Sequence, residues 1–481
     1  MAGPSTCLPV SFLFLLSLLG AMAQPALQPA LPGQCGQYAG QYVFSPCPVQ
    51  PQCQCSQVCV SCNSVGLTAL PAAMTAVFNS SMLMVDVSYN NITAAGLPEG
   101  IFAGLTQATG LWLEFNPLGT LPATLFTNMN ALVELRAEWC QLTTLPPGVL
   151  DPLVAVNQLR LENNLLQELP PAAFAKMRGL NQVRLDHNQL TQLSADVFAT
   201  LSAVTEMPLY TNNLTELPLG VFDGLIQVQS LSVANNYITS LPLGLFAYNT
   251  ALTALSFYNN FITELPVRLF ANLTQLQSLY LNGNRLTNAG LPPGIFNWSG
   301  ALTQLLLSDN YFTNFPLNQF NGAGGLEQLS VSGNQLTAVP NVNCPNLLVV
   351  GLDNNNFADP NSLAQQLVET VCDFGARIPI FSLAGNPAVC NAEPTRQNEY
   401  NCYCAEFFEL SEGQCVPPSR LTTSQIIGAA VGSLVGGALL TVLVLLIYRA
   451  VRRFRTLRSD LEVKELLLSE QGRELDELRS G

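Results

Sequence analysis

The chain has 481 residues, of which 48% are hydrophobic and only 10% are charged, and its formal net charge is −14. Soluble globular proteins carry about 25% charged residues, so this composition indicates that part of the chain is meant for lipid. The acidic balance argues against nucleic acid as a partner, because phosphate backbones bind basic surfaces.

The N-terminal residues carry the pattern of a secretion signal. An apolar run, LPVSFLFLLSLLGAMA, ends in Ala21, Met22 and Ala23. This small-x-small ending is typical of a signal-peptidase site. We therefore predict a cleaved signal peptide at residues 1–23.

The 14 cysteines agree with secretion. Apart from Cys7 in the signal and Cys140, they form two groups of six that bracket a long stretch. Even groups of this kind predict disulfide-stapled ends in an oxidising compartment. We expect an N-terminal cap at residues 24–71 and a C-terminal cap at residues 387–415. The disulfide candidates are Cys35, Cys47, Cys53, Cys55, Cys59, Cys62, Cys344, Cys372, Cys390, Cys402, Cys404 and Cys415.

Residues 72–386 contain about twelve repeats with a period of 24. Asparagine recurs in the frame L-x-x-L-x-L-x-x-N, and phenylalanine keeps the same period except at Leu150. Two steps of 26 come from ITAAGLP and LTNAGLP, which insert two residues before Leu97 and Leu291. The asparagines are residues 116, 164, 188, 212, 236, 260, 284, 310 and 334, followed by two irregular repeats at 355 and 386.

Each repeat predicts one short strand with its leucines pointing inward. Stacked neighbours then build a parallel sheet with strands ~4.8 Å apart. The asparagine amide satisfies main-chain groups that the following bend leaves unpaired. The predicted fold is an α/β-type solenoid, a curved horseshoe with the sheet on its concave face.

The repeat phrase LPxGxFxxLxxLxxLxLxxNxLTxLP resembles the extracellular leucine-rich repeat family, in the 24-residue class of Toll-like receptors, Slit proteins and variable lymphocyte receptors. Cys47-Pro48, Cys53-Gln54-Cys55 and CNSVGLTALP from Cys62 match that family's N-terminal cap. GNPAVC, which ends at Cys390, fits the family's C-terminal cap, whereas CYCAEFFELSEGQC is similar to the last loop of an EGF module. For this end we expect the pairs Cys344–Cys372, Cys390–Cys402 and Cys404–Cys415.

Cys140 lies in the asparagine column, 24 residues from both Asn116 and Asn164. We predict a buried, inert thiol at this position, since buried cysteines are common. The alternative is a reactive redox cysteine.

The candidate binding site comprises outward-facing strand positions in consecutive repeats. Each arginine lies two residues before an acidic residue and hence on the same face. One interpretation is a self-compensating charged surface that keeps the solenoid soluble. We favour recognition, because tryptophan, tyrosine and arginine dominate interface energies and exposed tryptophans are hard to justify otherwise. The set is Trp112, Glu114, Phe115, Arg136, Glu138, Trp139, Arg160, Glu162, Arg184, Asp186, His187 and Tyr210.

Five N-x-S/T motifs predict N-glycosylation, at Asn79, Asn91, Asn213, Asn272 and Asn297. None lies between Asn91 and Asn213, so we expect the candidate site to stay free of sugar.

Catalysis is not expected. Glu138 and Glu162 on neighbouring strands would lie ~5 Å apart, as in retaining glycosidases. However, any ladder of side chains gives that spacing, and an open sheet excludes no water. The sequence contains no nucleophile with a base and no metal-ligand set, and it predicts no cofactor.

Residues 426–448 predict one membrane-spanning helix after a juxtamembrane stalk at 416–425. The run has 23 residues without a charge, enough to cross ~30 Å of hydrocarbon. Five arginines follow between residues 449 and 458, so the positive-inside rule predicts a type I plasma-membrane protein with its N-terminus outside. Gly428, Gly432 and Gly436 favour helix packing at four-residue spacing, although glycine is frequent in such helices anyway.

The tail, residues 449–481, is basic and then amphipathic. It is too short for a TIR or kinase domain. Glu462, Leu466 and Leu467 in EVKELL resemble an acidic dileucine sorting signal.

These features predict a type I cell-surface recognition or adhesion receptor. It would bind an extracellular protein or glycan on its concave face and act through a homodimer or a co-receptor. The alternative is a structural adhesive or coat protein without a specific signalling role.

Overall fold

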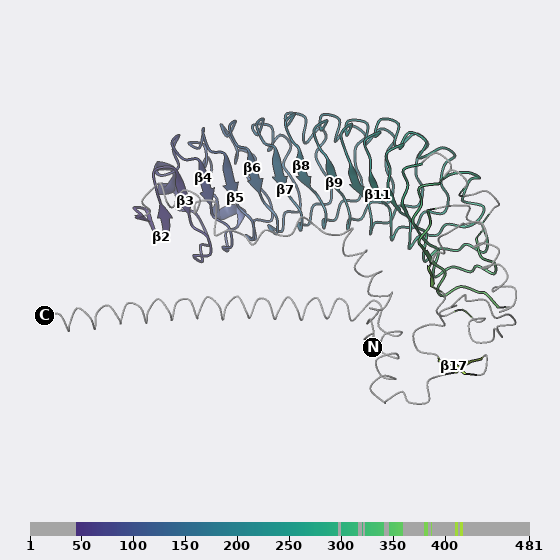
Figure 1. The fold of residues 1–481 in the computed structure, drawn as a ribbon. Helices are drawn as coiled ribbons and strands as arrows, with labels where there is room; N and C mark the ends of the chain where they lie inside the picture. Colours follow the sequence, from purple (N-terminus) through teal and green to yellow (C-terminus); the bar gives the residue numbers. More distant parts are fainter. Residues whose placement is uncertain are drawn as a thin grey trace, which may run out of the picture. The chain divides into compact units, whose positions relative to one another are not determined.

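The computed structural model describes residues 45–296, 300–315, 320, 323–340, 346–358, 380–382, 386, 409–411 and 414–416 (Figure 1). Several predictions concern other residues and therefore lie outside the described part. They are the signal peptide, Cys35, Cys344, Cys372, Cys390, Cys402, Cys404, Asn297, the membrane span with Gly428, Gly432 and Gly436, and the tail with Glu462, Leu466 and Leu467.

The chain divides into two compact units, Met1–Glu406 and Phe407–Gly481. The first unit holds a 16-stranded sheet in which the strands follow each other in chain order, side by side along an arc in Figure 1. Its strands are β1 (Ser45–Cys47), β2 (Gln50–Cys55), β3 (Cys59–Ser61), β4 (Met84–Asp86), β5 (Gly110–Trp112), β6 (Glu134–Arg136), β7 (Gln158–Arg160), β8 (Gln182–Arg184), β9 (Glu206–Pro208), β10 (Ser230–Ser232), β11 (Ala254–Ser256), β12 (Ser278–Tyr280), β13 (Gln304–Leu306), β14 (Gln328–Ser330), β15 (Val349–Gly351) and β16 (Ile380–Ser382).

The second unit contributes a described hairpin, β17 (Glu409–Ser411) with β18 (Gln414–Val416). Cys415 lies in β18, in a segment whose side chains are not described.

The parallel sheet confirms the predicted solenoid of about twelve turns. From β3 to β16 every strand is parallel to the next, and most neighbours pair at a shift of 24 residues, as Leu111 with Leu135. The two predicted insertions shift the register by 26, pairing Met84 with Gly110 and Ser278 with Gln304. Each insertion packs a glycine onto the preceding repeat: at Gly290 a Cβ would overlap the carbonyl oxygen of Thr263.

The core is built from the repeated leucines and phenylalanines. Phenylalanine rings from successive repeats are fully buried and several are stacked, as Phe222 on Phe246 with ring centroids 6.2 Å apart. The asparagines are buried as well and fasten each turn to the one before. Asn188 illustrates the pattern: its Nδ2 donates to the carbonyl of Leu161 at 3.0 Å, and its Oδ1 accepts from the Leu166 N–H at 3.1 Å.

The convex side differs from the α/β expectation, because the described residues contain no α-helix. Turns fill this side, joined by two 3-10 segments, η1 (Ala72–Ala76) and η2 (Ala94–Gly96). The LPxG phrase explains the difference. It places a proline two residues before a glycine with positive φ, as at Gly220 with φ 88°, and that conformation ends a right-handed helix.

Disulfides link the first described strands, which lie within the predicted N-terminal cap. Cys47 pairs with Cys55, Cys53 pairs with Cys62, and Cys59 is also disulfide-bonded. Strands β1 to β3 are antiparallel to one another, and β3 then joins β4 in parallel. The cap therefore covers the first edge of the parallel sheet, which would otherwise expose unpaired main-chain groups.

In the described part of the chain, no helix has the length and apolar character needed to cross a bilayer.

Candidate ligand-binding site

Three rows of side chains run across the concave face, one residue per repeat in each row. The first row contains the last residue of each strand, the second row lies two residues later, and the third row lies one residue after that. The register places Trp112, Arg136, Arg160 and Arg184 in consecutive first-row positions. The structure thus brings the twelve predicted residues together on β5–β9 and the residues that follow these strands.

The third row begins with a stack of aromatic rings. Tyr89 lies on Phe115 with ring centroids 4.3 Å apart and planes 15° apart, and Phe115 lies on Trp139 at 5.6 Å and 10°. Trp139 is 51% exposed. Sequence reasoning missed Tyr89, because this repeat lies 26 residues before the next one rather than 24. Tyr89 directly precedes Asn90, as Phe115 precedes Asn116, and this shared position could have identified it.

All third-row residues adopt a left-handed backbone. Phe115 and Trp139 have φ of 56°, and His187 has φ of 54°. Glycine and asparagine tolerate this region, whereas large side chains there cost about 1 kcal/mol or more. Aromatic residues at these positions are therefore unfavourable for folding on conformational grounds.

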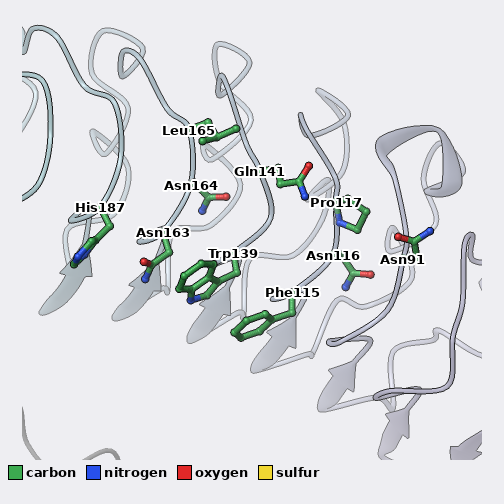
Figure 2. A pocket seen from close by; sticks show the side chains of 10 residues that line it. All are labelled: Asn91, Phe115, Asn116, Pro117, Trp139, Gln141, Asn163, Asn164, Leu165 and His187. Atoms are coloured by element: carbon green, nitrogen blue, oxygen red, sulfur yellow. The ribbon is translucent and has the colours of Figure 1, made fainter. Parts of the chain in front are cut away.

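A shallow cleft of about 600 Å³ lies beside the stack. Figure 2 shows the Trp139 and Phe115 rings on one side and the amides of Asn163 and Gln141 nearby, with His187 beyond. The cleft is also lined by Asn91, Asn116, Pro117, Asn164 and Leu165.

The Asn91 sequon lies at the border of the surface that we predict to be free of sugar. The repeat places Asn91 in the same column as Pro117 and Gln141, and it lines the end of the cleft. Its side chain is exposed, as are those of Asn79 and Asn272, whereas Asn213 is half-buried.

Trp112 corrects one expectation, the exposure of this tryptophan, since it is only 5% exposed. It packs with Met84 and Cys59 of the two preceding strands, and the Arg136 guanidinium covers its ring at 4.1 Å from the centroid. Its indole Nε1 donates to Glu134 at 3.4 Å. First-row side chains on a concave sheet crowd each other, so a large ring there is covered by its neighbours.

The predicted pairing of each arginine with the next acidic residue holds in two repeats. Arg184 binds Asp186 with Nε to Oδ1 at 2.8 Å, and Arg160 approaches Glu162 at 3.9 Å. Arg136 instead binds Glu134, two residues before it, at 2.7 Å.

The Asp186 carboxylate is the best-satisfied acid of the second row. Besides Arg184, it binds His187 Nδ1 at 3.0 Å, and Arg184 also donates to the Tyr210 hydroxyl at 3.2 Å. Burial opposes ionisation, but the hydrogen bonds from His187 and Arg184 lower the pKa of Asp186. This network fixes His187 at the edge of the cleft.

The other three second-row acids are poorly satisfied. The Oε2 atoms of Glu114, Glu138 and Glu162 are buried and accept no hydrogen bond within the described residues. Burial raises the pKa of Glu114 to about 8, with a contribution from the charge of Glu138. Burial likewise raises the pKa of Glu138 to about 7, and it raises the pKa of Glu162. Glu114 and Glu138 therefore stay partly protonated near neutral pH.

Cys140 is buried, as predicted. Its Sγ donates to the Leu113 carbonyl at 3.3 Å. An asparagine at this position would accept a hydrogen bond from the Leu118 N–H, which here donates to the Asn116 carbonyl at 2.8 Å instead. Burial raises the pKa of the thiol to about 12. A thiol in this state is neither an accessible nor a reactive nucleophile.

Comparisons with known proteins agree with the repeat architecture. A family model described as Leucine rich repeat matches residues 178–233 and 226–286, and a second one of the same description matches residues 275–298. These models describe a repeat rather than a catalytic domain. No curated protein sequence matches the chain significantly.

Solved structures share the fold at low identity. A Drosophila Toll chain from a complex with Spatzle is 21% identical over 61% of this chain, with a TM-score of 0.47. The plant peptide hormone receptor RGFR1, solved with RGF2, is 20% identical over 60%, with a TM-score of 0.50. A chain of the octameric complex of Latrophilin 3, Unc5D and FLRT2, in which FLRT2 supplies the leucine-rich repeats, is 22% identical over 69%, with a TM-score of 0.50.

The alignments cover 47% of the Toll chain, 46% of RGFR1 and 91% of the third chain. This chain therefore spans about half the length of the first two. Together with the sheet, the family models and the matches to RGFR1 and to the third chain support a leucine-rich repeat fold.

Proposed function

We propose that this protein is a cell-surface recognition receptor that binds an extracellular protein or glycan on the N-terminal half of its concave face, from β4 to β9. One observation carries the proposal. A half-exposed stack of aromatic rings occupies backbone positions that disfavour aromatic residues. Next to it, the Arg184–Asp186 ion pair holds His187 in place through a hydrogen bond. Side chains kept at a cost to folding are characteristic of binding sites.

The comparisons support a binding role. RGFR1 was solved with RGF2, and FLRT2 was solved with Latrophilin 3 and Unc5D. Both proteins were thus solved in protein complexes, and we transfer a role in protein binding to the present chain as part of the proposal.

The anchoring features complete the proposal. Residues 426–448 would hold the chain in the plasma membrane with its N-terminus outside, and Gly428, Gly432 and Gly436 would favour a homodimer. A co-receptor would serve the same purpose.

Surface cross-linking tests the proposal. The full-length chain is displayed on cells, cross-linked to bound molecules and purified, and its partners are identified by mass spectrometry. We expect one partner to be captured by the wild type and by a Ser232→Ala control, but not by a Trp139→Ala, His187→Ala double variant. Equal capture by all three would contradict a specific site and favour the alternative of a structural coat protein.

A further inference from the structure

The aromatic stack of the third row is interrupted after Trp139. The next repeat holds Asn163, a small side chain, and the repeat after that holds His187. Figure 2 shows Asn163 between the two rings. Phe115 covers one face of the Trp139 ring at 5.6 Å, while the other face points toward the Asn163 repeat.

The interruption leaves room for one more ring. Neighbouring strands lie ~4.8 Å apart, so two repeats separate Trp139 from His187 by roughly 10 Å. A flat ring inserted between two others needs about 7 Å, which is twice a normal contact distance. A six-membered ring therefore fits above Asn163 and continues the stack.

The lining of the slot defines the chemistry of that ring. The amides of Asn163 and Gln141 lie nearest to it, and among the described residues that line the cleft only His187 is titratable. Asp186 holds His187 through Nδ1, so the other ring nitrogen remains to face the cleft. The arginines and glutamates of the first and second rows do not line the cleft. An aromatic platform with neutral donors and acceptors at its edge matches a ligand with an apolar face and polar substituents around its rim.

We propose that this slot binds one pyranose ring of a neutral saccharide. The C–H face of the sugar stacks on Trp139, and its hydroxyl groups bond to Asn163, Gln141 and His187. This inference rests on the proposed function and names the ligand chemistry of the same site. Two sources supply such a ring: a glycan of a partner molecule, or the chain's own glycan at Asn91, whose exposed side chain borders the cleft.

Saccharide titration of the full-length chain tests the inference. The chain is purified in a detergent without sugar headgroups, and tryptophan fluorescence is followed while chitotriose, cellotriose or mannotriose is added. We expect at least one trisaccharide to shift the emission in a saturable way. Trp139→Asn should weaken this binding at least tenfold, whereas Trp139→Tyr, which keeps a ring, should lose less. Fluorescence cannot report on variants without Trp139, so calorimetry measures their affinity.

The chain offers a matched control. Tyr237 is also 51% exposed and also stacks on a neighbouring ring, Phe261, at 5.8 Å, but it does not line the cleft. Tyr237→Asn should leave saccharide affinity unchanged. An equal loss in both variants would show that saccharides bind exposed aromatic residues unspecifically and would overturn the inference.

The same titration with an Asn91→Gln variant distinguishes a partner's glycan from the chain's own glycan at Asn91. If the wild type binds no trisaccharide but Asn91→Gln does, the glycan at Asn91 occupies the slot, and the sugar chemistry stands. If both bind, the slot is open to a partner glycan. No response in either form up to about 50 mM would overturn the inference. If the cross-linking experiment then still showed partner capture that depends on Trp139, the proposed function would stand, and a protein rather than a sugar would contact the slot.

Discussion

The N-terminal half of the concave face, from β4 to β9, and the C-terminal half, from β10 to β14, share one backbone but present opposite surfaces. The third row shows the contrast most clearly. Trp139 and Asn259 have φ of 56° and 54°, so both occupy the same left-handed conformation. In the C-terminal half this position holds residues that tolerate it, namely Asn235, Asn259, Gly283, Asp309 and Gly333.

Several polar side chains of the C-terminal half bond to one another, although the buried Ser256 hydroxyl has no partner among the described residues. Asn259 donates to Asn235 at 2.9 Å, and the hydroxyls of Ser308 and Ser330 share a bond of 2.6 Å. In the N-terminal half, by contrast, carboxyl oxygens stay unsatisfied and a tryptophan stays half-exposed. The difference teaches that the repeat folds with mostly small, uncharged side chains on this face, so the aromatic and charged residues of the N-terminal half serve a separate purpose.

Converting the third row of the N-terminal half to that of the C-terminal half should have the largest effect. In a Phe115→Asn, Trp139→Asn variant, asparagine suits the left-handed backbone, so the solenoid should stay folded. Partner affinity should fall at least a hundredfold, since buried aromatic hot spots contribute about 2–4 kcal/mol each. Surface plasmon resonance with the captured partner measures the loss. The same exchange at Tyr258, made as Tyr258→Asn, should change affinity less than twofold.

The buried glutamates should make the two halves respond differently to pH. Glu114 and Glu138 have folded-state pKa values of about 8 and 7, above the value near 4.5 of an unfolded chain. Between pH 4.5 and 8 the folded form therefore holds more protons than the unfolded form, and these groups make stability fall as pH rises. Their environment includes Asp86, Glu162, Arg136 and Arg160.

A Glu114→Gln, Glu138→Gln variant should remove that dependence. Relative to wild type, its free energy of unfolding should be similar at pH 4.5 and higher by roughly 1–3 kcal/mol at pH 8.5. Urea denaturation across this range checks the difference, with the exposed Glu216→Gln as control. If the difference in free energy of unfolding between the variant and the wild type became smaller as pH rises, the buried, protonated state of these glutamates would be contradicted.

Cys140 interrupts the asparagine ladder within the N-terminal half. Cys140→Asn should add the missing bond from Leu118 N–H and raise the free energy of unfolding by about 1 kcal/mol. The reverse change in a regular repeat, Asn188→Cys, should lower it by a similar amount. Thermal unfolding monitored by circular dichroism compares the two, and a destabilised Cys140→Asn would mean that the site has adapted to sulfur.

Thr211 marks the border between the halves and carries a smaller strain. Its φ of 57° is unfavourable for a β-branched side chain. Thr211→Asn should therefore stabilise the chain by roughly 0.5–1 kcal/mol without altering partner affinity. Chemical denaturation together with a binding assay tests both parts, and a loss of affinity would extend the site past β9.

The period of 24 was enough to predict the sheet, because each repeat must bury its leucines against its neighbours. Even the two insertions could be located, at the steps where the register shifts by 26. The convex side could not be derived in the same way. Residues with positive φ, such as Gly220, give turns instead of a helix on this side. The backbone conformation of the segment that returns to the next strand does not follow from the hydrophobic period.

The members of the candidate site were also predictable, but their exposure was not. Outward direction follows from alternation along a strand, and it placed Trp112 and Trp139 on the same face. Whether a side chain stays accessible depends on its neighbours in the adjacent repeats. Arg136 covers Trp112, whereas Asn163 leaves Trp139 open. The choice of Glu134 over Glu138 as partner of Arg136 depends on the same crowding.

Oxidative footprinting of the full-length chain, alone and with its captured partner, tests the central claim most directly. Hydroxyl radicals label exposed aromatic and histidine side chains, so both halves of the concave face report in one experiment. The account predicts that the partner protects Trp139 and His187 while labelling of Tyr258 and Tyr280 stays unchanged. Protection of Tyr258 and Tyr280 with Trp139 still fully labelled would contradict it.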